Sequence, residues 1–137
     1  MSILRRIFGV ILGFVVASAV MLLIEFTNGH LLYPEVGAAA KLVKTSAQMK
    51  DLMAQVPAGS LGVVIVGWLL GSIAGGWAAT RIARSESAGP AISLGVLLLL
   101  AGISNNLMMP PPTWFWVLSL AVFFPGAWYG ARLAGSR

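Results

Sequence analysis

Four apolar runs, each close to twenty residues long, constrain this chain more than any other feature of its sequence. They cover residues 7–26, 60–80, 91–109 and 113–131. A run of this length crosses the ~30 Å hydrocarbon core of a bilayer as a helix. Since lipid offers no partner for backbone amides, a helix is also the form that satisfies them internally. We therefore predict an all-α, polytopic membrane protein in which residues 1–137 form a single transmembrane domain.

The composition supports a lipid environment and argues against several kinds of site. Of the 137 residues, 58% are hydrophobic and 9% are charged. Cysteine is absent and there is one histidine, which leaves too few ligands for a disulfide framework or a metal site. The net charge of +5 lies at the ends of the spans, where membrane topology and anionic lipid headgroups account for it. We expect the lipid bilayer as partner, and no cofactor, metal, catalytic residue or nucleic acid.

Small residues recur at every fourth position of the second span, and again in the fourth. The two stripes consist of Gly67, Gly71, Gly75 and Ala79, and of Gly126, Gly130 and Ala134. Residues four apart share one face of a helix, and a face without side chains lets another helix approach closely. In lipid such van der Waals contact holds helices together, because hydrophobic burial does not. We predict that the five glycines pack helix against helix.

The connection at residues 35–58 separates the first two spans. Residues 38–56 contain no glycine or proline, so we predict a short amphipathic helix in this outer loop. Its apolar face would hold Leu42, Met49, Leu52, Met53 and Val56, and its polar face Lys41, Lys44, Gln48, Lys50 and Asp51. Such a helix either lies on the membrane surface or packs over the ends of the bundle, and the sequence does not separate the two arrangements.

Glycine and proline predict where the helices end or bend. Gly29 suits the C-terminus of the first helix, and Pro34 prevents its continuation. Pro90 suits the first turn of the third helix. Pro125 lies inside the fourth span and predicts a kink there, because proline removes one hydrogen bond of the helix.

Part of the chain repeats. Residues 75–85 align without gaps on residues 126–136, and five of the eleven positions are identical: Gly, Trp, Arg, Ala and Ser. A weaker match in the same order relates residues 22–34 to residues 98–110. Convergence of membrane helix ends explains the shared residue types, but it explains the shared spacing less well. We predict a duplicated helical hairpin. Its two copies span residues 1–89 and 90–137.

The distribution of basic residues predicts the orientation in the membrane. All six arginines lie in the N-terminal tail, the turn at 81–89 and the C-terminus, whereas all three lysines lie in the 35–58 connection. Cytoplasmic segments carry the excess of basic residues, so we expect a multi-pass protein of a bacterial inner membrane with both termini in the cytoplasm. Aromatic and arginine side chains would anchor the two interfaces. The expected anchors are Trp77, Arg81, Trp114, Trp116, Trp128 and Arg132.

Ionisable residues inside a span are the usual pointers to function in a membrane protein. Here the candidate is Glu25, near the outer end of the first span. Other polar side chains are expected at the same level. The predicted cluster consists of Glu25, Asn28, His30, Asn105 and Asn106. It would form a pocket for a ligand or an ion beneath the 35–58 connection, or a structural hydrogen-bond network. The simpler alternative is that Glu25 is an interfacial carboxylate in contact with water.

Several segments resemble small four-span inner-membrane proteins found in bacteria. The residues that carry the resemblance are Ile24-Glu25, Gly29-His30, Tyr33-Pro34, Gly71, Gly75-Gly76-Trp77 and Arg81-Ile82-Ala83. The resemblance implies a four-helix fold and a membrane location, and it implies no particular activity.

These observations favour a non-enzymatic integral membrane protein that acts through helix–helix contacts. It would work as a homo-oligomer or as an accessory subunit in a complex with another membrane protein. The alternative is a small transporter or channel that uses the polar cluster. An accessory subunit needs an exposed face of small residues, whereas a proton-coupled transporter needs Glu25 shielded from bulk water.

Overall fold

The computed structural model describes residues 3–136, which form helices joined by short loops and contain no strand. The elements are α1 (Ile3–Thr27), the π-helix η1 (Asn28–Leu32), α2 (Pro34–Lys41), α3 (Ser46–Gln55), α4 (Ala58–Ala83), α5 (Gly89–Met108), α6 (Thr113–Ala121) and α7 (Phe123–Leu133). Four stretches are long and apolar enough to cross a membrane: Ile3–Leu32, Ala58–Ala83, Gly89–Met108 and Thr113–Leu133. The prediction of an all-helical chain with four potential spans is confirmed for these residues. Arg137, one of the basic residues used to predict the orientation, lies outside them.

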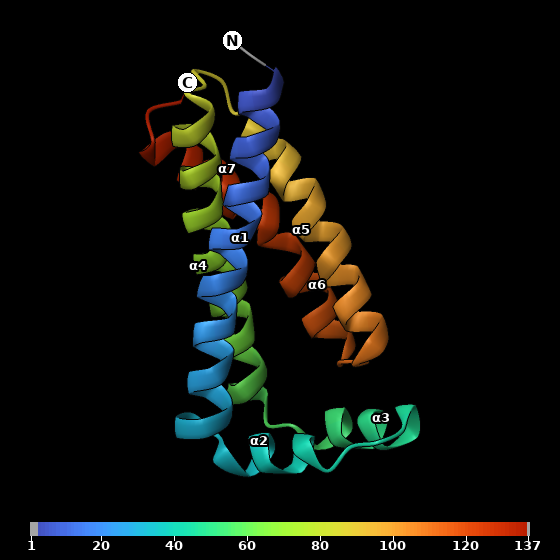
Figure 1. Cartoon of the computed structure of the whole chain (residues 1–137). Coiled ribbons are helices and arrows are strands. Elements are labelled where there is room, and N and C mark those ends of the chain that lie inside the picture. The colour runs from blue at the N-terminus through green and yellow to red at the C-terminus, as the bar shows by residue number, and fades with distance from the viewer. Residues whose placement is uncertain (1–2, 137) are drawn as a thin grey trace.

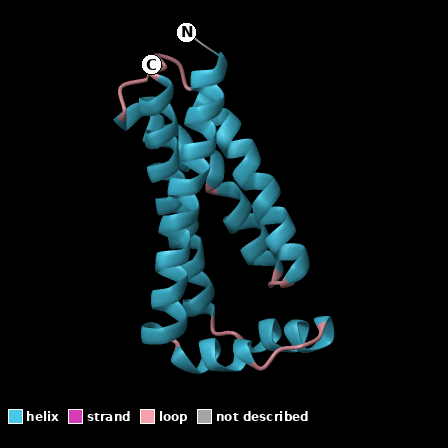
Figure 2. Ribbon diagram, viewed as in Figure 1, coloured by secondary structure: helices cyan, strands magenta, loops and turns pink. Residues whose placement is uncertain are grey.

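The helices form two pairs that meet at one end of the molecule and separate toward the other. α1 and α4 lie side by side along their length, and α5 lies beside the α6–α7 pair (Figure 1). The two pairs are in contact near the end that holds both termini, where α7 packs on α4. Toward the opposite end α5 and α6 diverge from α1 and α4, and α2 and α3 lie across that end of the molecule (Figure 2).

Glycines bring the backbones of α1 and α4 into contact. A Cβ atom added at Gly75 would lie 2.7 Å from the carbonyl oxygen of Gly13, and one added at Gly13 would lie 2.8 Å from that of Gly75. One helical turn further along α4, a Cβ atom at Gly9 would lie 2.8 Å from the carbonyl oxygen of Ala79. Real Cβ atoms do not approach this closely, so a larger residue would force one of the two backbones to shift. The small stripe of α4 therefore faces α1.

A second small face of α4 contacts α7. Gly76 lies against the backbone of Ala127, and Gly130 lies against the backbone of Ile73. Because α1 and α7 both approach its backbone, α4 is the central helix of the fold. The glycines of the two predicted stripes are thus buried within one chain.

The first helix continues past Gly29, where the sequence predicted its end. The chain stays helical through η1 to Leu32 and turns at Tyr33, whose backbone lies at φ −134° and ψ 64°. α2 then begins with Pro34, which needs no backbone N–H in the first turn of a helix. Gly29 instead makes a close contact, because Gly37 of α2 lies against its backbone and has no room for a side chain.

The connection between the first two spans contains two short helices, not the single helix predicted over residues 38–56. Thr45 separates them by capping α3. Its hydroxyl accepts from the backbone N–H of Gln48 at 3.1 Å, and the Gln48 side chain accepts from the N–H of Thr45 at 3.2 Å. This capping box starts a new helix and separates Leu42, which is 75% exposed, from the other predicted apolar positions. Those positions are half-buried: Met49, Leu52, Met53 and Val56.

The fourth span is interrupted at Val122. α6 ends at Ala121, and α7 begins at Phe123. Pro125 has no N–H to donate to the carbonyl of Ala121, four residues earlier, and its ring crowds that carbonyl. The bend expected from Pro125 is therefore located where the missing hydrogen bond would have been.

Candidate functional site

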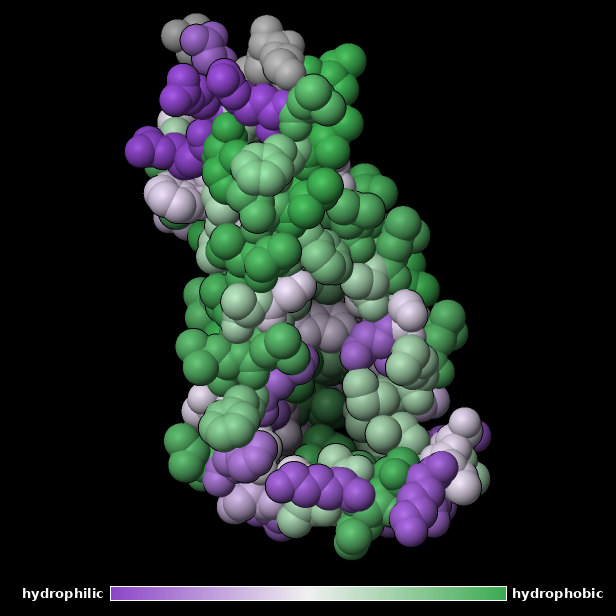
Figure 3. All heavy atoms as spheres, in the orientation of Figure 1, coloured by the Kyte–Doolittle hydropathy of each residue, from purple (hydrophilic) through white to green (hydrophobic). Residues whose placement is uncertain are grey.

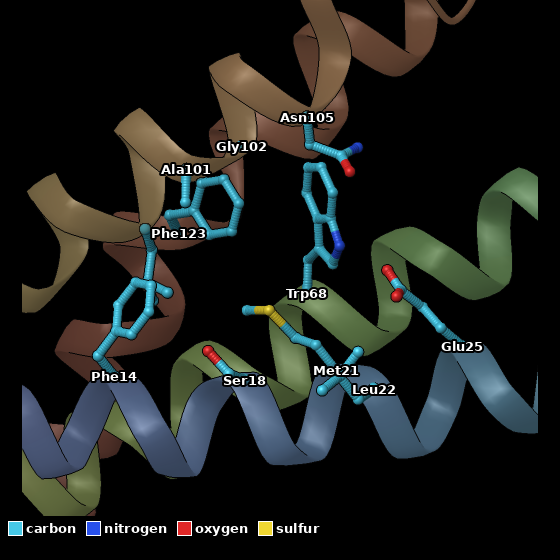
Figure 4. Close-up of a pocket in the computed structure, with 11 residues that line it drawn as sticks. Phe14, Ser18, Met21, Leu22, Glu25, Trp68, Ala101, Gly102, Asn105 and Phe123 are labelled. Carbon is cyan, nitrogen blue, oxygen red and sulfur yellow. The ribbon is translucent and has the colours of Figure 1, made fainter. Parts of the chain in front are cut away.

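A cleft opens between the two helix pairs, in the region where they separate. It has a volume of about 310 Å³ and is lined by residues of α1, α4, α5 and α7. Figure 3 shows the surface hollowed above α2 and α3. Three aromatic and three polar side chains of the wall appear in Figure 4: Phe14, Trp68 and Phe123, and Ser18, Glu25 and Asn105.

Glu25 is the only ionisable residue among the described residues that line the cleft. It lies on α1 and is half-buried. Trp68 of α4 also lines the cleft, and Figure 4 shows its indole nitrogen on the side of the ring that faces the Glu25 carboxylate. No basic side chain lines the cleft in the described part of the chain. Since a carboxylate without a basic partner is costly in apolar surroundings, Glu25 is the functional candidate of this cleft.

Trp68 forms a rigid part of the wall. It is 4% exposed, its ring stacks on that of Phe123 with the centroids 5.2 Å apart, and it meets Phe115 edge-on at 5.7 Å. Such aromatic contacts fix the orientation of the ring. This packing therefore holds the indole N–H on the side of the ring that faces Glu25.

The structure places only two residues of the predicted polar cluster in the cleft. Glu25 and Asn105 both line it. Asn28 is buried elsewhere, where its side-chain amide donates to the carbonyl of Ser60 at 3.1 Å and its side-chain carbonyl accepts from the Ser60 hydroxyl at 3.2 Å. Asn28 therefore joins the end of the first span to the start of the second.

The two remaining members of the cluster also lie apart from the cleft. His30 is exposed, with Nδ1 3.0 Å from the carbonyl oxygen of Phe26 and its ring stacked on the Phe26 ring at 4.1 Å. Asn106 is fully buried and donates its side-chain amide to the hydroxyl of Ser119 on α6 at 3.2 Å. Its side-chain oxygen has no hydrogen-bond partner among residues 3–136. The predicted five-residue pocket is thus not formed.

All five glycines predicted to pack lie between helices. Gly67, Gly71 and Gly75 face α1, while Gly126 and Gly130 face α4. A Cβ atom added at Gly71 or Gly126 would lie less than 3.0 Å from its neighbours. These contacts fix α1, α4 and α7 relative to one another, and so they position three of the four helices that line the cleft.

Four of the predicted interface anchors form two similar contacts. The guanidinium of Arg81 lies 5.6 Å from the ring centroid of Trp77, and that of Arg132 lies 5.5 Å from the ring centroid of Trp128. Both distances allow a cation–π interaction. The other two anchors lie in the first turn of α6: Trp114 and Trp116.

α4 and α7 also end alike. Arg84 and Gly135, which occupy aligned positions after the two helices, have positive φ angles of 52° and 99°. In each case the next residue donates its backbone N–H to a carbonyl five residues earlier, as in a Schellman motif. These hydrogen bonds run from Ser85 to Thr80 at 3.1 Å and from Ser136 to Ala131 at 3.0 Å.

The site residues predicted from the sequence do not include Ser18, Trp68 or Phe123. A signal for Trp68 exists, because tryptophan in membrane helices prefers the interfaces and Trp68 lies in the middle of its span. Ser18 and Phe123 carry no comparable signal, since small and aromatic residues are ordinary constituents of a span.

Within residues 3–136, no group of three or more His, Cys, Asp and Glu side chains is placed to hold a metal ion. Comparison of the chain with protein-family models, with curated proteins and with solved structures gives no match. The cleft itself is therefore the basis for assigning a function.

Proposed function

We propose that this protein is a small, non-enzymatic membrane transporter or channel that binds its ligand in the cleft between the helix pairs. The observation that carries the proposal is a carboxylate, Glu25, in the wall of a largely apolar cavity between helices long enough to cross a membrane. Ionisable residues are rare in spans and mark substrate or ion pathways. Apolar clefts with a few placed polar groups are the usual form of a ligand site.

A function through helix contacts alone has less support. It required an exposed face of small residues, but the glycine stripes of α4 and α7 are buried against other helices of the same chain. A homo-oligomer or a complex with another membrane protein would have to use the large apolar side chains exposed along the spans. These side chains equally suit contact with lipid, so assembly of this kind stays a prediction.

The proposal includes a bacterial inner membrane as the location, with both termini in the cytoplasm. Both termini lie at one end of the molecule (Figure 1). Five of the six arginines, all but Arg137, lie in described segments at that end, against three lysines in the 35–58 connection. α2 and α3 would then lie on the outer surface of that inner membrane. Reporters fused to the termini would contradict this orientation if they were active only in the outer compartment.

We also propose that the two helix pairs arose by duplication of one helical hairpin. Its support is the gapless match of residues 75–85 with 126–136, the two Arg–Trp contacts and the two Schellman ends.

If the ends of α4 and α7 are equivalent, glycine at the position of positive φ should stabilise both of them, since glycine adopts positive φ without steric cost. We expect Arg84→Gly to stabilise and Gly135→Ala to destabilise the fold, each by about 1 kcal/mol. Thermal unfolding shifts of the same sign would contradict equivalence.

Access of water to the cleft tests the transport proposal. The chain has no cysteine, so a single introduced cysteine reports one position. Ala101 lines the cleft, whereas its neighbour Leu100 does not and is 58% exposed on α5. A thiol reacts as the thiolate, which forms in water and not in hydrocarbon.

We expect Ala101→Cys in proteoliposomes to react with a charged methanethiosulfonate reagent about ten times faster than Leu100→Cys. Leu100→Cys is the matched control, because it lies on the same helix at nearly the same depth. Equal rates at the two positions would show that the cleft is no more accessible than the lipid-facing surface, and would contradict a transport function.

A further inference from the structure

We propose that the ligand of the cleft is an organic cation, namely an ammonium group that carries apolar substituents. The inference rests on the proposed function and adds the chemical class of the ligand. Its basis is the combination of one carboxylate, several aromatic side chains and no basic side chain in the described wall of the cleft.

The charge of the wall favours a cation. Glu25 lies across from Trp68, and none of the described residues that line the cleft is basic and able to offset its charge. Removing an ionised group from water without a counter-charge is costly, and a bound cation offsets that cost. An anionic ligand would be repelled by the same carboxylate, and a neutral ligand would leave it without a partner.

The aromatic side chains favour an organic cation. Phe14, Trp68 and Phe123 contribute rings from three different helices, α1, α4 and α7. Aromatic faces attract ammonium groups, and they do so more strongly where water is excluded. The stacking of Trp68 on Phe123 fixes these two rings before any ligand arrives, so a ligand would not have to order them.

The same wall suits a metal ion poorly. Its side-chain oxygens come from Ser18, Glu25 and Asn105 alone, whereas Ca²⁺ takes about six to eight oxygen ligands. The volume of about 310 Å³ also far exceeds a single ion and lies in the range of small-molecule sites. A molecule with several carbon atoms matches both the size and the apolar lining.

The position of the opening is consistent with an amphipathic ligand. Leu22 lines the cleft and is nevertheless 65% exposed, so the cavity reaches the lateral surface of the helix bundle. Figure 3 shows the hollow bordered by hydrophilic as well as apolar side chains. An ammonium compound with apolar groups partitions into the bilayer and would reach Glu25 from that side.

The indole N–H of Trp68 is a direct probe of the cleft. The purified full chain, labelled with ¹⁵N-tryptophan in detergent micelles, should show one indole signal that Trp68→Phe removes. Titration with benzyltrimethylammonium should shift that signal saturably. Neopentylbenzene has the same shape without the charge, and we expect it to bind at least about tenfold more weakly. Equal effects of the two probes would overturn the inference and would indicate a site for neutral apolar molecules, such as lipid chains.

Glu25→Gln keeps the shape of the side chain and removes its charge. We expect it to weaken binding of benzyltrimethylammonium about tenfold or more, whereas Glu35→Gln, an equal charge change on exposed α2, should have no effect. Unchanged binding in Glu25→Gln, or no shift of the Trp68 signal in the wild type, would overturn the inference. Should Glu25→Gln misfold, the comparison of the two probes on the wild type still decides. Reactive Ala101→Cys without cation binding would leave the transport proposal standing and refute only the ligand class.

Discussion

The two helix pairs of this protein use glycine in different ways. In the first pair, Gly13 of α1 and Gly75 of α4 face each other, and the two backbones are in contact. In the second pair, Gly102 of α5 faces an aromatic ring, since a Cβ atom there would lie 2.5 Å from the ring of Phe123. Glycine removes the space between the helices of the first pair, and it makes room for a ring in the second.

This difference explains where the cleft lies. The ring of Phe123 that fills the notch at Gly102 also stacks on Trp68 of α4. A layer of aromatic side chains thus separates α5 from α4, and the cleft lies beside that layer. The close contact of α1 with α4 fixes the two helices that carry Glu25 and Trp68 relative to each other.

The largest effect is expected from filling the contact between backbones. Gly75→Leu places a large side chain where even a Cβ atom would lie 2.7 Å from the Gly13 carbonyl. Overpacking of a close contact costs about 1–3 kcal/mol or more, and here neither backbone can withdraw alone. We expect loss of cooperative thermal unfolding in mild detergent.

The control for Gly75→Leu is Val66→Leu, which enlarges a side chain of the same helix that is 51% exposed. It should leave the unfolding midpoint nearly unchanged. If Gly75→Leu melted like the wild type, the small stripe of α4 would not face α1 and the first half of the comparison would be wrong.

The second prediction compares the loss of stability caused by the same substitution at two neighbouring residues of α5. Asn106 is fully buried beside Ser119, whereas Asn105 is half-buried and lines the cleft. Asn106→Asp would bury a carboxylate without a basic partner, and we expect a loss of about 3 kcal/mol. Asn105→Asp should cost clearly less, because the cleft reaches the surface. Equal losses in thermal or denaturant unfolding would show that Asn105 is not in an accessible cleft.

The smallest effect is expected in the second pair, where glycines of α5 face aromatic rings. A Cβ atom at Gly95 would lie 2.9 Å from the Phe124 ring, which is 38% exposed and can turn outward. We expect Gly95→Ala to cost less than about 1 kcal/mol, and Gly75→Ala to cost more, because a ring yields where a backbone does not. Unfolding midpoints lowered equally by the two substitutions would remove the distinction between the pairs.

Hydrophobic length and residue spacing were sufficient to predict much of the fold. The four spans follow from the length of the apolar runs, and the register of Gly67, Gly71 and Gly75 follows from the helical period. The sequence could not show that this face meets α1, because a stripe identifies a contact face without its partner. It also missed the break before Thr45, where a local capping box overrides an otherwise continuous helical pattern.

The candidate site was less predictable, for a geometric reason. The sequence placed Asn105 and Asn106 in one pocket because they lie at one depth, but consecutive residues of a helix point about 100° apart. Asn105 therefore lines the cleft, whereas Asn106 points away from it and contacts Ser119. Trp68 was not predicted as a site residue, although its mid-span position is unusual for tryptophan.

The central claim is that α1 and α5 face each other across one cavity, and a single thiol can test it directly. Ser18 of α1 and Ala101 of α5 both line the cleft, and Leu100 does not. The measurement is the rate at which a charged thiol reagent modifies Ser18→Cys when a phenylalanine is added on α5. We predict that Ala101→Phe slows the reaction about tenfold by filling the space in front of the thiol, and that Leu100→Phe leaves it unchanged. Equal rates with both substitutions would show that α1 and α5 do not share a cavity, and would contradict the account.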